Sequence, residues 1–140
     1  MSRRRMVRTL LLMSALGILG CREPDRQPFL VEIPAGYKGW VSVRFFAGEA
    51  CPEVPVEGGR PVLRVPQSGR ACFGSPLGFG DVKDDYYYVD AAGRRTDIRD
   101  LVHREHVALE GASPNQKVYE RFFVGTEEDL KNAPPEPKEE

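Results

Sequence analysis

Two histidines lie three residues apart in the segment His103-Arg104-Glu105-His106 of this chain of 140 residues. On a helix their imidazoles would share one face and could chelate a metal ion, whereas on a strand they would point apart. The sequence offers no evident third ligand for a site at His103 and His106. The pattern therefore favours the absence of a metal at these histidines, and the sequence predicts no cofactor.

Four aspartates in the middle of the chain could offer oxygen ligands to calcium: Asp81, Asp84, Asp85 and Asp90. Their spacing is not that of an established calcium loop, so the pattern favours a solvated acidic turn. A serine nucleophile would need a positioned base and an elbow such as G-x-S-x-G, and neither is evident. We therefore expect a protein without enzymatic activity.

The N-terminus has the parts of an export leader. Arginines at positions 3, 4, 5 and 8 precede an apolar stretch over residues 9–20, which carries no charge and is too short to span a bilayer as a helix. It ends in Ile18-Leu19-Gly20-Cys21, which resembles the processing box of bacterial lipoproteins. The resemblance implies that residues 1–20 are a lipoprotein signal peptide and that Cys21, acylated at its thiol, begins the mature protein.

A lipid on Cys21 would make the membrane a partner and place the protein at the bacterial cell envelope. Arg22 follows the cysteine, and this implies sorting to the outer membrane, facing the periplasm or the cell surface. The alternative is an ordinary signal peptide with a chance cysteine. The arginine-rich start also resembles a twin-arginine export signal, although the general secretory route is favoured.

Two cysteines remain once Cys21 is set aside, namely Cys51 and Cys72. Because disulfides persist outside the cytoplasm, we predict a bridge between them. It would close a loop of about 20 residues and stabilise the fold by about 3 kcal/mol on the chain-entropy model. The alternative is a pair of buried free thiols.

Charge excludes one class of partner. Removing residues 1–20 takes four arginines from the 20 basic residues and no acid from the 21, which leaves 16 minus 21, a net charge of −5. An acidic domain is a poor binder of nucleic acid, so we expect none. The remaining chain of about 120 residues is long enough for one domain with one core and too short for two.

Aromatic side chains are the best candidates for a binding face. Trp40 precedes a run of alternating apolar residues, and three tyrosines follow one another at residues 86–88. Exposed aromatics on a sheet stack on sugars or on partner side chains. The predicted face consists of Tyr37, Trp40, Tyr86 and Tyr88. The alternative is packing in the core, and the exposure of these four side chains separates the two.

The elements that would position these residues are short strands joined by turns rich in glycine and proline. Alternation predicts strands over residues 29–33, 40–46, 61–65, 70–73, 86–89, 94–98 and 116–124. The turn at Gln67-Ser68-Gly69 predicts a hairpin between the third and fourth of them. Residues 96–109 could form one helical face, but irregular or strand structure is favoured. Thr126 and the acids after it predict a helix start.

These elements predict a mostly β fold, a small antiparallel β-sandwich of the immunoglobulin-like or transthyretin-like kind with a short C-terminal helix. We expect a tether over residues 21–28, the sandwich over residues 29–132 and a disordered tail over residues 133–140, where prolines and charges dominate.

Several short motifs occur together in the mature chain. They are Ile33-Pro34-Ala35-Gly36-Tyr37-Lys38-Gly39-Trp40-Val41, Asp85-Tyr86-Tyr87-Tyr88 and Phe122-Phe123-Val124-Gly125-Thr126-Glu127-Glu128. In combination they resemble an uncharacterised family of secreted bacterial domains of unknown function, over residues 33 to 130. The resemblance implies a common fold and export, and it implies no activity.

The function expected from the sequence is therefore a lipid-anchored, non-enzymatic envelope protein that acts as a structural or protein-interaction module. Its partner would be another envelope protein or the cell wall. The alternative is a small-ligand- or metal-binding periplasmic accessory lipoprotein that uses the region of His103 and His106.

Overall fold

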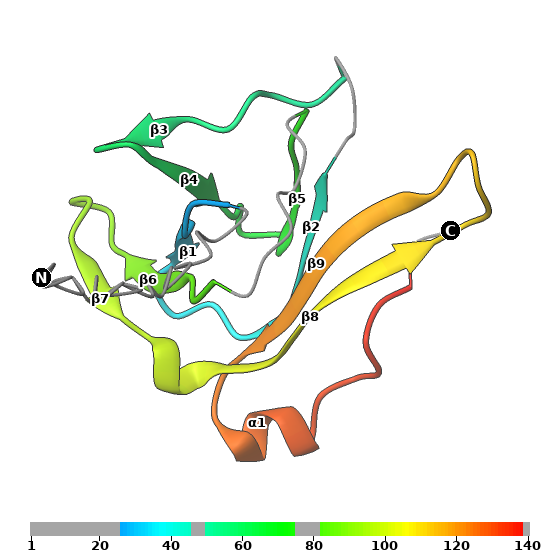
Figure 1. Cartoon of the computed structure of the whole chain (residues 1–140). Helices are drawn as coiled ribbons and strands as arrows, with labels where there is room; N and C mark the ends of the chain where they lie inside the picture. The colour runs from blue at the N-terminus through cyan, green and yellow to red at the C-terminus, as the bar shows by residue number, and fades with distance from the viewer. Residues whose placement is uncertain (1–25, 46–49, 75–81, 139–140) are drawn as a thin grey trace, which may run out of the picture.

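The computed structural model describes residues 26–45, 50–74 and 82–138. Within these ranges the chain forms two β-sheets that pack face to face, and one short helix lies beneath them (Figure 1). No described helix has the length and apolar character needed to cross a membrane. Cys21 and the leader lie outside the described residues.

The first sheet has five strands in the order β3-β4-β1-β6-β7. Its bounds are β1 Leu30–Pro34, β3 Val56–Glu57, β4 Arg60–Arg64, β6 Asp85–Val89 and β7 Arg95–Asp97. The central strand β1 runs parallel to both of its neighbours, β4 and β6. The hairpin between β6 and β7 is antiparallel.

The second sheet has four strands in the order β5-β2-β9-β8. Its bounds are β2 Gly39–Phe45, β5 Arg70–Cys72, β8 Val102–Glu110 and β9 Lys117–Val124, and the helix α1 covers Glu127–Lys131. Strand β9 pairs antiparallel with both β2 and β8, whereas β5 runs parallel to β2. Within residues 96–109, for which the sequence favoured irregular or strand structure over a helix, Arg99–Leu101 form a 3₁₀ turn and β8 follows.

The core lies between the inner faces of the two sheets. Alternation predicts that Val41, Val43 and Phe45 point inward, and all three are buried. From the opposite sheet, β6 contributes Tyr86, whose ring meets that of Phe122 edge to face at 5.1 Å. Aromatic and branched side chains from both layers therefore join the sheets.

The sequence prediction of a mostly β fold with sandwich-like packing and a short C-terminal helix is confirmed. The sheets are mixed, however, and not purely antiparallel. The predicted hairpin across the turn at residues 67–69 is wrong: β4 belongs to the first sheet and β5 to the second. That turn carries the chain from one layer to the other because each strand finds a better partner in β1 or β2.

Some residues within the expected tether and the expected tail contact the domain. Arg26, expected in a loose leash, donates to both carboxylate oxygens of Asp84 at 2.7 and 2.9 Å. At the other end, the carbonyl oxygen of Pro134 accepts from the indole of Trp40, and Glu136 contacts His106. Figure 1 shows the red C-terminal segment running from α1 back toward β8. Pro134 and Glu136 therefore contact the two-sheet domain.

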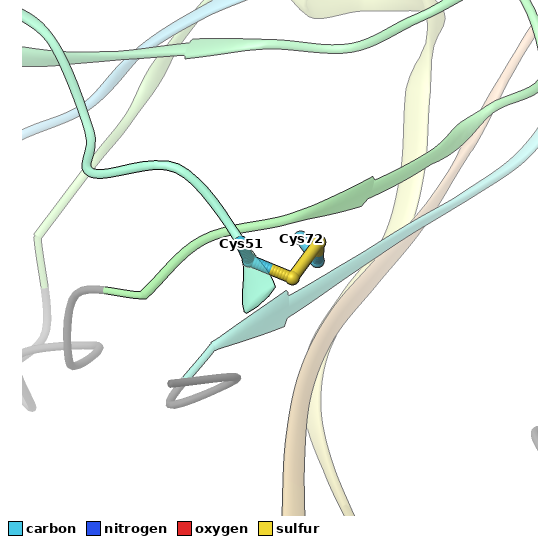
Figure 2. Close-up of a disulfide and its surroundings, with 2 residues drawn as sticks. All are labelled: Cys51 and Cys72. Carbon is cyan, nitrogen blue, oxygen red and sulfur yellow. A yellow bond between two sulfur atoms is a disulfide. The ribbon is translucent and has the colours of Figure 1, made fainter. Parts of the chain in front are cut away.

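The predicted disulfide is present. Cys51 and Cys72 are bonded, with their Cα atoms 5.6 Å apart. Figure 2 shows that the bridge fastens the segment before β3 to the end of β5, beside the end of β2. The bridge therefore holds edge strand β5 in place, although β5 has only three residues.

Candidate functional site

The predicted aromatic face is only partly a surface. Tyr86 is 1% exposed and belongs to the core, so its assignment to a binding face is corrected. Strand alternation explains this: Tyr86 and Tyr88 both point inward, and Tyr88 is half-buried against the core. Tyr87 points outward, where the guanidinium of Arg95 lies 5.9 Å from its ring centre.

Polar atoms of the other three aromatics are used inside the domain. The hydroxyl of Tyr88 donates to the carbonyl oxygen of Tyr37 at 2.6 Å, and the hydroxyl of Tyr37 donates to the carbonyl oxygen of Trp40 at 2.5 Å. Burial raises the pKa of both hydroxyls above the usual tyrosine value. The Trp40 ring packs edge to face on Phe123 at 5.5 Å. These half-buried side chains tie the 35–40 turn to both sheets and leave little free polar surface.

A β-bulge decides where the two histidines lie. His103 pairs with Phe123 and His106 with Arg121, so the two residues of β8 between them oppose a single residue of β9. Arg104, the first of these two, has φ 54°. The bulge therefore places both histidines on the outer face of the sheet, although a regular strand would separate them.

The two histidines nevertheless hold different partners. A ring nitrogen of His103 contacts the carbonyl oxygen of Gly125 at 2.9 Å, and His106 contacts Glu136 at 3.0 Å. Within the ranges that the structure describes, no group of three potential ligands includes a histidine.

The outer face of the second sheet carries a basic pocket at its β5 and β2 side. A shallow hollow of about 250 Å³ is lined by Ser42, Arg44, Arg70, Ala71, Cys72 and Tyr119. Because Val41, Val43 and Phe45 point into the core, Ser42 and Arg44 must point outward. Parallel pairing places Arg70 beside Ser42 and Cys72 beside Arg44. The disulfide therefore fixes one wall of the pocket.

The electrostatics of this pocket favour an anion. Arg44 and Arg70 both line it, and the buried Nε of Arg44 has no hydrogen-bond partner. Next to it, the guanidinium of Arg121 lies 4.7 Å above the ring of Tyr119 and pairs with Glu110 at 2.6 Å. Planar guanidinium groups bind carboxylates and phosphates through paired N–H donors.

A second charged group lies between the sheets. Among the described residues, Asp84, Glu105 and Glu120 each place one carboxylate oxygen within 4.8 Å of the others. Burial, together with the charges of Asp84 and Glu105, raises the pKa of Glu120 to about 8. Burial and the charge of Glu120 likewise raise the pKa of Tyr86, whose hydroxyl donates to Glu120 Oε1 at 3.4 Å.

Comparison with known proteins identifies the family. A family of unknown function, DUF6843, matches residues 25–133. The chain belongs to this family. No curated protein sequence matches it. A crystal structure described as "Putative Lipoprotein from Bacillus anthracis" is similar, with a TM-score of 0.63 and 22% identity over 80% of this chain and 82% of that one. At this identity the likeness shows a shared fold.

For this DUF6843 member, reasoning from the sequence found the disulfide and missed both charged clusters. Asp84 was expected in a solvated turn, yet it is 1% exposed. Alternation puts Glu120 on the same strand face as Phe122 and Val124. A glutamate on an otherwise apolar face was the available signal, since a buried charge needs a partner. Arg44 was placed outward, and no local pattern linked it to Arg70, which lies on a strand in parallel pairing.

Proposed function

We propose that this protein is a lipid-anchored protein of the bacterial envelope that acts as a structural or protein-interaction module and not as an enzyme. Three observations support the location. The Ile18-Leu19-Gly20-Cys21 segment follows a basic and apolar leader, the similar structure is described as a lipoprotein, and the domain carries a disulfide suited to an oxidising compartment. The outer membrane is the proposed site of anchoring.

The observation that carries the interaction role is the pocket that Arg44 and Arg70 line on the outer face of the second sheet. It would receive a carboxylate of an envelope protein or of the cell wall, because Arg44 and Arg70 line one shallow hollow. The disulfide beside the pocket makes β5 a rigid wall, so little conformational entropy would be lost when a partner binds.

Anchoring is tested by replacing Cys21 with serine and separating membranes from soluble protein. The proposal expects Cys21→Ser to move the protein to the soluble fraction, since serine is not acylated at this position. The matched control is the double variant Cys51→Ser/Cys72→Ser, which makes the same replacement twice and keeps Cys21, so it should stay with membranes. Membrane retention of Cys21→Ser would refute the lipid anchor.

The interaction role is tested separately by crosslinking in intact cells, with a photoreactive residue beside the pocket at Gln67. Gln67 lies in the exposed turn before β5. We expect a discrete crosslinked product that Arg44→Gln/Arg70→Gln removes. Arg94→Gln is the control, because the Arg94 side chain is 83% exposed in the β6–β7 turn. A product that persists in the double variant would mean that the pocket does not bind the partner.

A further inference from the structure

Three acidic side chains meet at the open side of the sandwich, although they come from three different elements. Asp84 directly precedes β6 in the first sheet, Glu105 lies in the bulge of β8, and Glu120 points inward from β9. One carboxylate oxygen of each lies within 4.8 Å of the other two. Asp84 and Glu120 are buried and Glu105 is exposed, so the cluster has a closed floor and an open mouth.

The side chain of Glu120 supplies an observation independent of this clustering. Glu120 is only 4% exposed, and its Oε1 accepts from the hydroxyl of Tyr86. Its second oxygen, Oε2, is buried without any hydrogen-bond partner. A buried polar atom left unpaired costs free energy, and native structures leave few of them. This oxygen is therefore available to a hydrogen-bond donor or to a cation that replaces the carboxyl proton.

The charges around Glu120 favour a cation. Arg26 pairs with Asp84 through two hydrogen bonds, and the backbone N–H of Phe29 donates to Asp84 Oδ1 at 2.8 Å. Arg99 Nη2 lies 3.6 Å from Asp85 without a hydrogen-bond partner, and the guanidinium of Arg99 lies 5.6 Å from the centre of the Tyr86 ring. Arg26 supplies one positive charge against the carboxyl groups of Asp84, Glu105 and Glu120. A bound divalent ion would supply the further positive charge that lets Glu120 ionise beside Asp84 and Glu105.

The donor atoms indicate which divalent ion. All three ligands are carboxylate oxygens, which suit hard cations such as calcium and magnesium. Two oxygens bound to one calcium ion at about 2.3–2.6 Å can be up to about 5 Å apart, whereas magnesium requires oxygens within about 4.2 Å. The three oxygens lie within 4.8 Å of one another, so small side-chain adjustments would bring them to calcium–oxygen distances, and the larger, more flexible shell of calcium accepts such a set more readily than the octahedral shell of magnesium. Water entering past exposed Glu105 can complete a coordination shell of six to eight oxygens.

We propose that Asp84, Glu105 and Glu120 form a calcium-binding site that clamps the two sheets together at their open side. The ion would link the start of β6 to β8 and β9. The contact between the rings of Tyr86 and Phe122 already joins β6 to β9 in the core. Sites of extracellular modules bind calcium with dissociation constants of about 0.1–1 mM. This site stands on its own geometry and does not depend on the anchoring or the partner proposed above.

The test uses the full chain, purified in detergent with its native N-terminus and freed of metal with EDTA. Thermal unfolding is followed at rising CaCl₂ and, in parallel, MgCl₂, and calcium binding is measured by isothermal titration calorimetry. A calcium concentration ten times the dissociation constant favours the folded state about elevenfold. We expect calcium to raise Tm by about 4–8 °C under that condition, with a smaller effect of magnesium.

Two variants decide the assignment. Glu120→Gln keeps an oxygen that accepts from Tyr86 and removes the buried carboxyl group. Glu105→Gln changes an exposed side chain, so this variant should fold normally. Both should abolish the calcium-dependent rise in Tm and the calorimetric signal. Glu128→Gln is the matched control, an exposed glutamate on α1, and should behave like the unmodified chain. No calcium binding by the unmodified chain, or equal binding by Glu105→Gln, would overturn the proposal.

Discussion

The indole N–H of Trp40 donates to the carbonyl oxygen of Pro134 at 2.9 Å and so joins the start of β2 to the chain beyond α1. The C-terminal segment continues along the outer face of the second sheet, where Glu136 meets His106 and lies 3.7 Å from Arg121. Phe123 lies on the same face, under the ring of Trp40. The tail therefore acts as an ordered cover on the β8 and β9 side and leaves the basic pocket open on the β5 side.

Replacing Trp40 with phenylalanine should loosen this cover. Trp40→Phe keeps an aromatic ring on Phe123 and removes the N–H donor, so we expect a loss of about 0.5–1.5 kcal/mol in urea unfolding. The tail should also become more sensitive to carboxypeptidase. In a chain truncated after Asn132, the same substitution should cost less, because the acceptor is gone. An equal cost in both backgrounds would show that ring packing alone explains the effect.

The ion pair between Arg26 and Asp84 should contribute strongly to stability. The Asp84 side chain is fully buried and that of Arg26 is 12% exposed. Asp84→Asn removes the charge and leaves the guanidinium facing an amide, which should cost about 1.5–3 kcal/mol in urea unfolding with EDTA present. The control is Asp90→Asn, since Asp90 pairs with the exposed Arg94, and it should cost less than about 1 kcal/mol. Equal losses would place Asp84 among ordinary surface acids.

The strand positions were predictable and the order of the strands was not, for a physical reason. Alternation in β2 reports which side chains face the core, and Val41, Val43 and Phe45 were predicted to point inward from it. Alternation does not report which strand lies next to which. Parallel pairing of β1 with β4 and β6 depends on contacts between residues far apart in sequence, so the hairpin predicted at residues 67–69 failed.

The charged sites were hidden for the same reason. Asp84 sits in a local run of acids that is typical of a solvated turn, and only the fold brings Arg26 and Glu120 to it. The proline-rich end of the chain is typical of disorder, and only the placement of Trp40 gives Pro134 a donor. Composition could not reveal these contacts, because the partners of both segments lie far away in the sequence.

Breaking the disulfide should destabilise the domain as its loop length suggests. Cys51 and Cys72 are 21 residues apart, which corresponds to about 3 kcal/mol on the chain-entropy model. Cys51→Ser/Cys72→Ser should lose about this much in chemical unfolding under oxidising conditions. With a reducing agent present, the unmodified chain and the variant should unfold together. If the reduced chain and the variant still differ in unfolding free energy by the same amount, the serine side chains and not the missing bridge cause the loss of stability.

Gly69 should tolerate no side chain, whereas Gly59 should tolerate a methyl group. Both have positive φ, +74° and +81°. A Cβ at Gly69 would meet the Tyr37 ring and lie 2.8 Å from the carbonyl oxygen of Trp40, but one at Gly59 would meet nothing within 4 Å. Gly59→Ala should cost about 1 kcal/mol from backbone strain alone, and Gly69→Ala about 3 kcal/mol because overpacking adds to it. Equal losses of unfolding free energy for the two variants would mean that the turn containing Tyr37 moves to accommodate the added methyl group.

The capping box of α1 should survive into strong acid. Asp129 accepts from the backbone N–H and the hydroxyl of Thr126, and Lys38 pairs with it at 3.1 Å. The hydrogen bonds from Thr126 lower the pKa of Asp129 from 3.8 to about 2. Because the folded-state pKa is the lower one, the stabilisation is complete above pH 3.8 and is lost as the pH falls through about 2. A carboxyl-carbon NMR titration of the full chain should place the midpoint near 2, and in Thr126→Val, which keeps only the backbone donor, it should rise toward 3.8. A midpoint near 3.8 in the unmodified chain would show that the cap does not hold the carboxylate in solution.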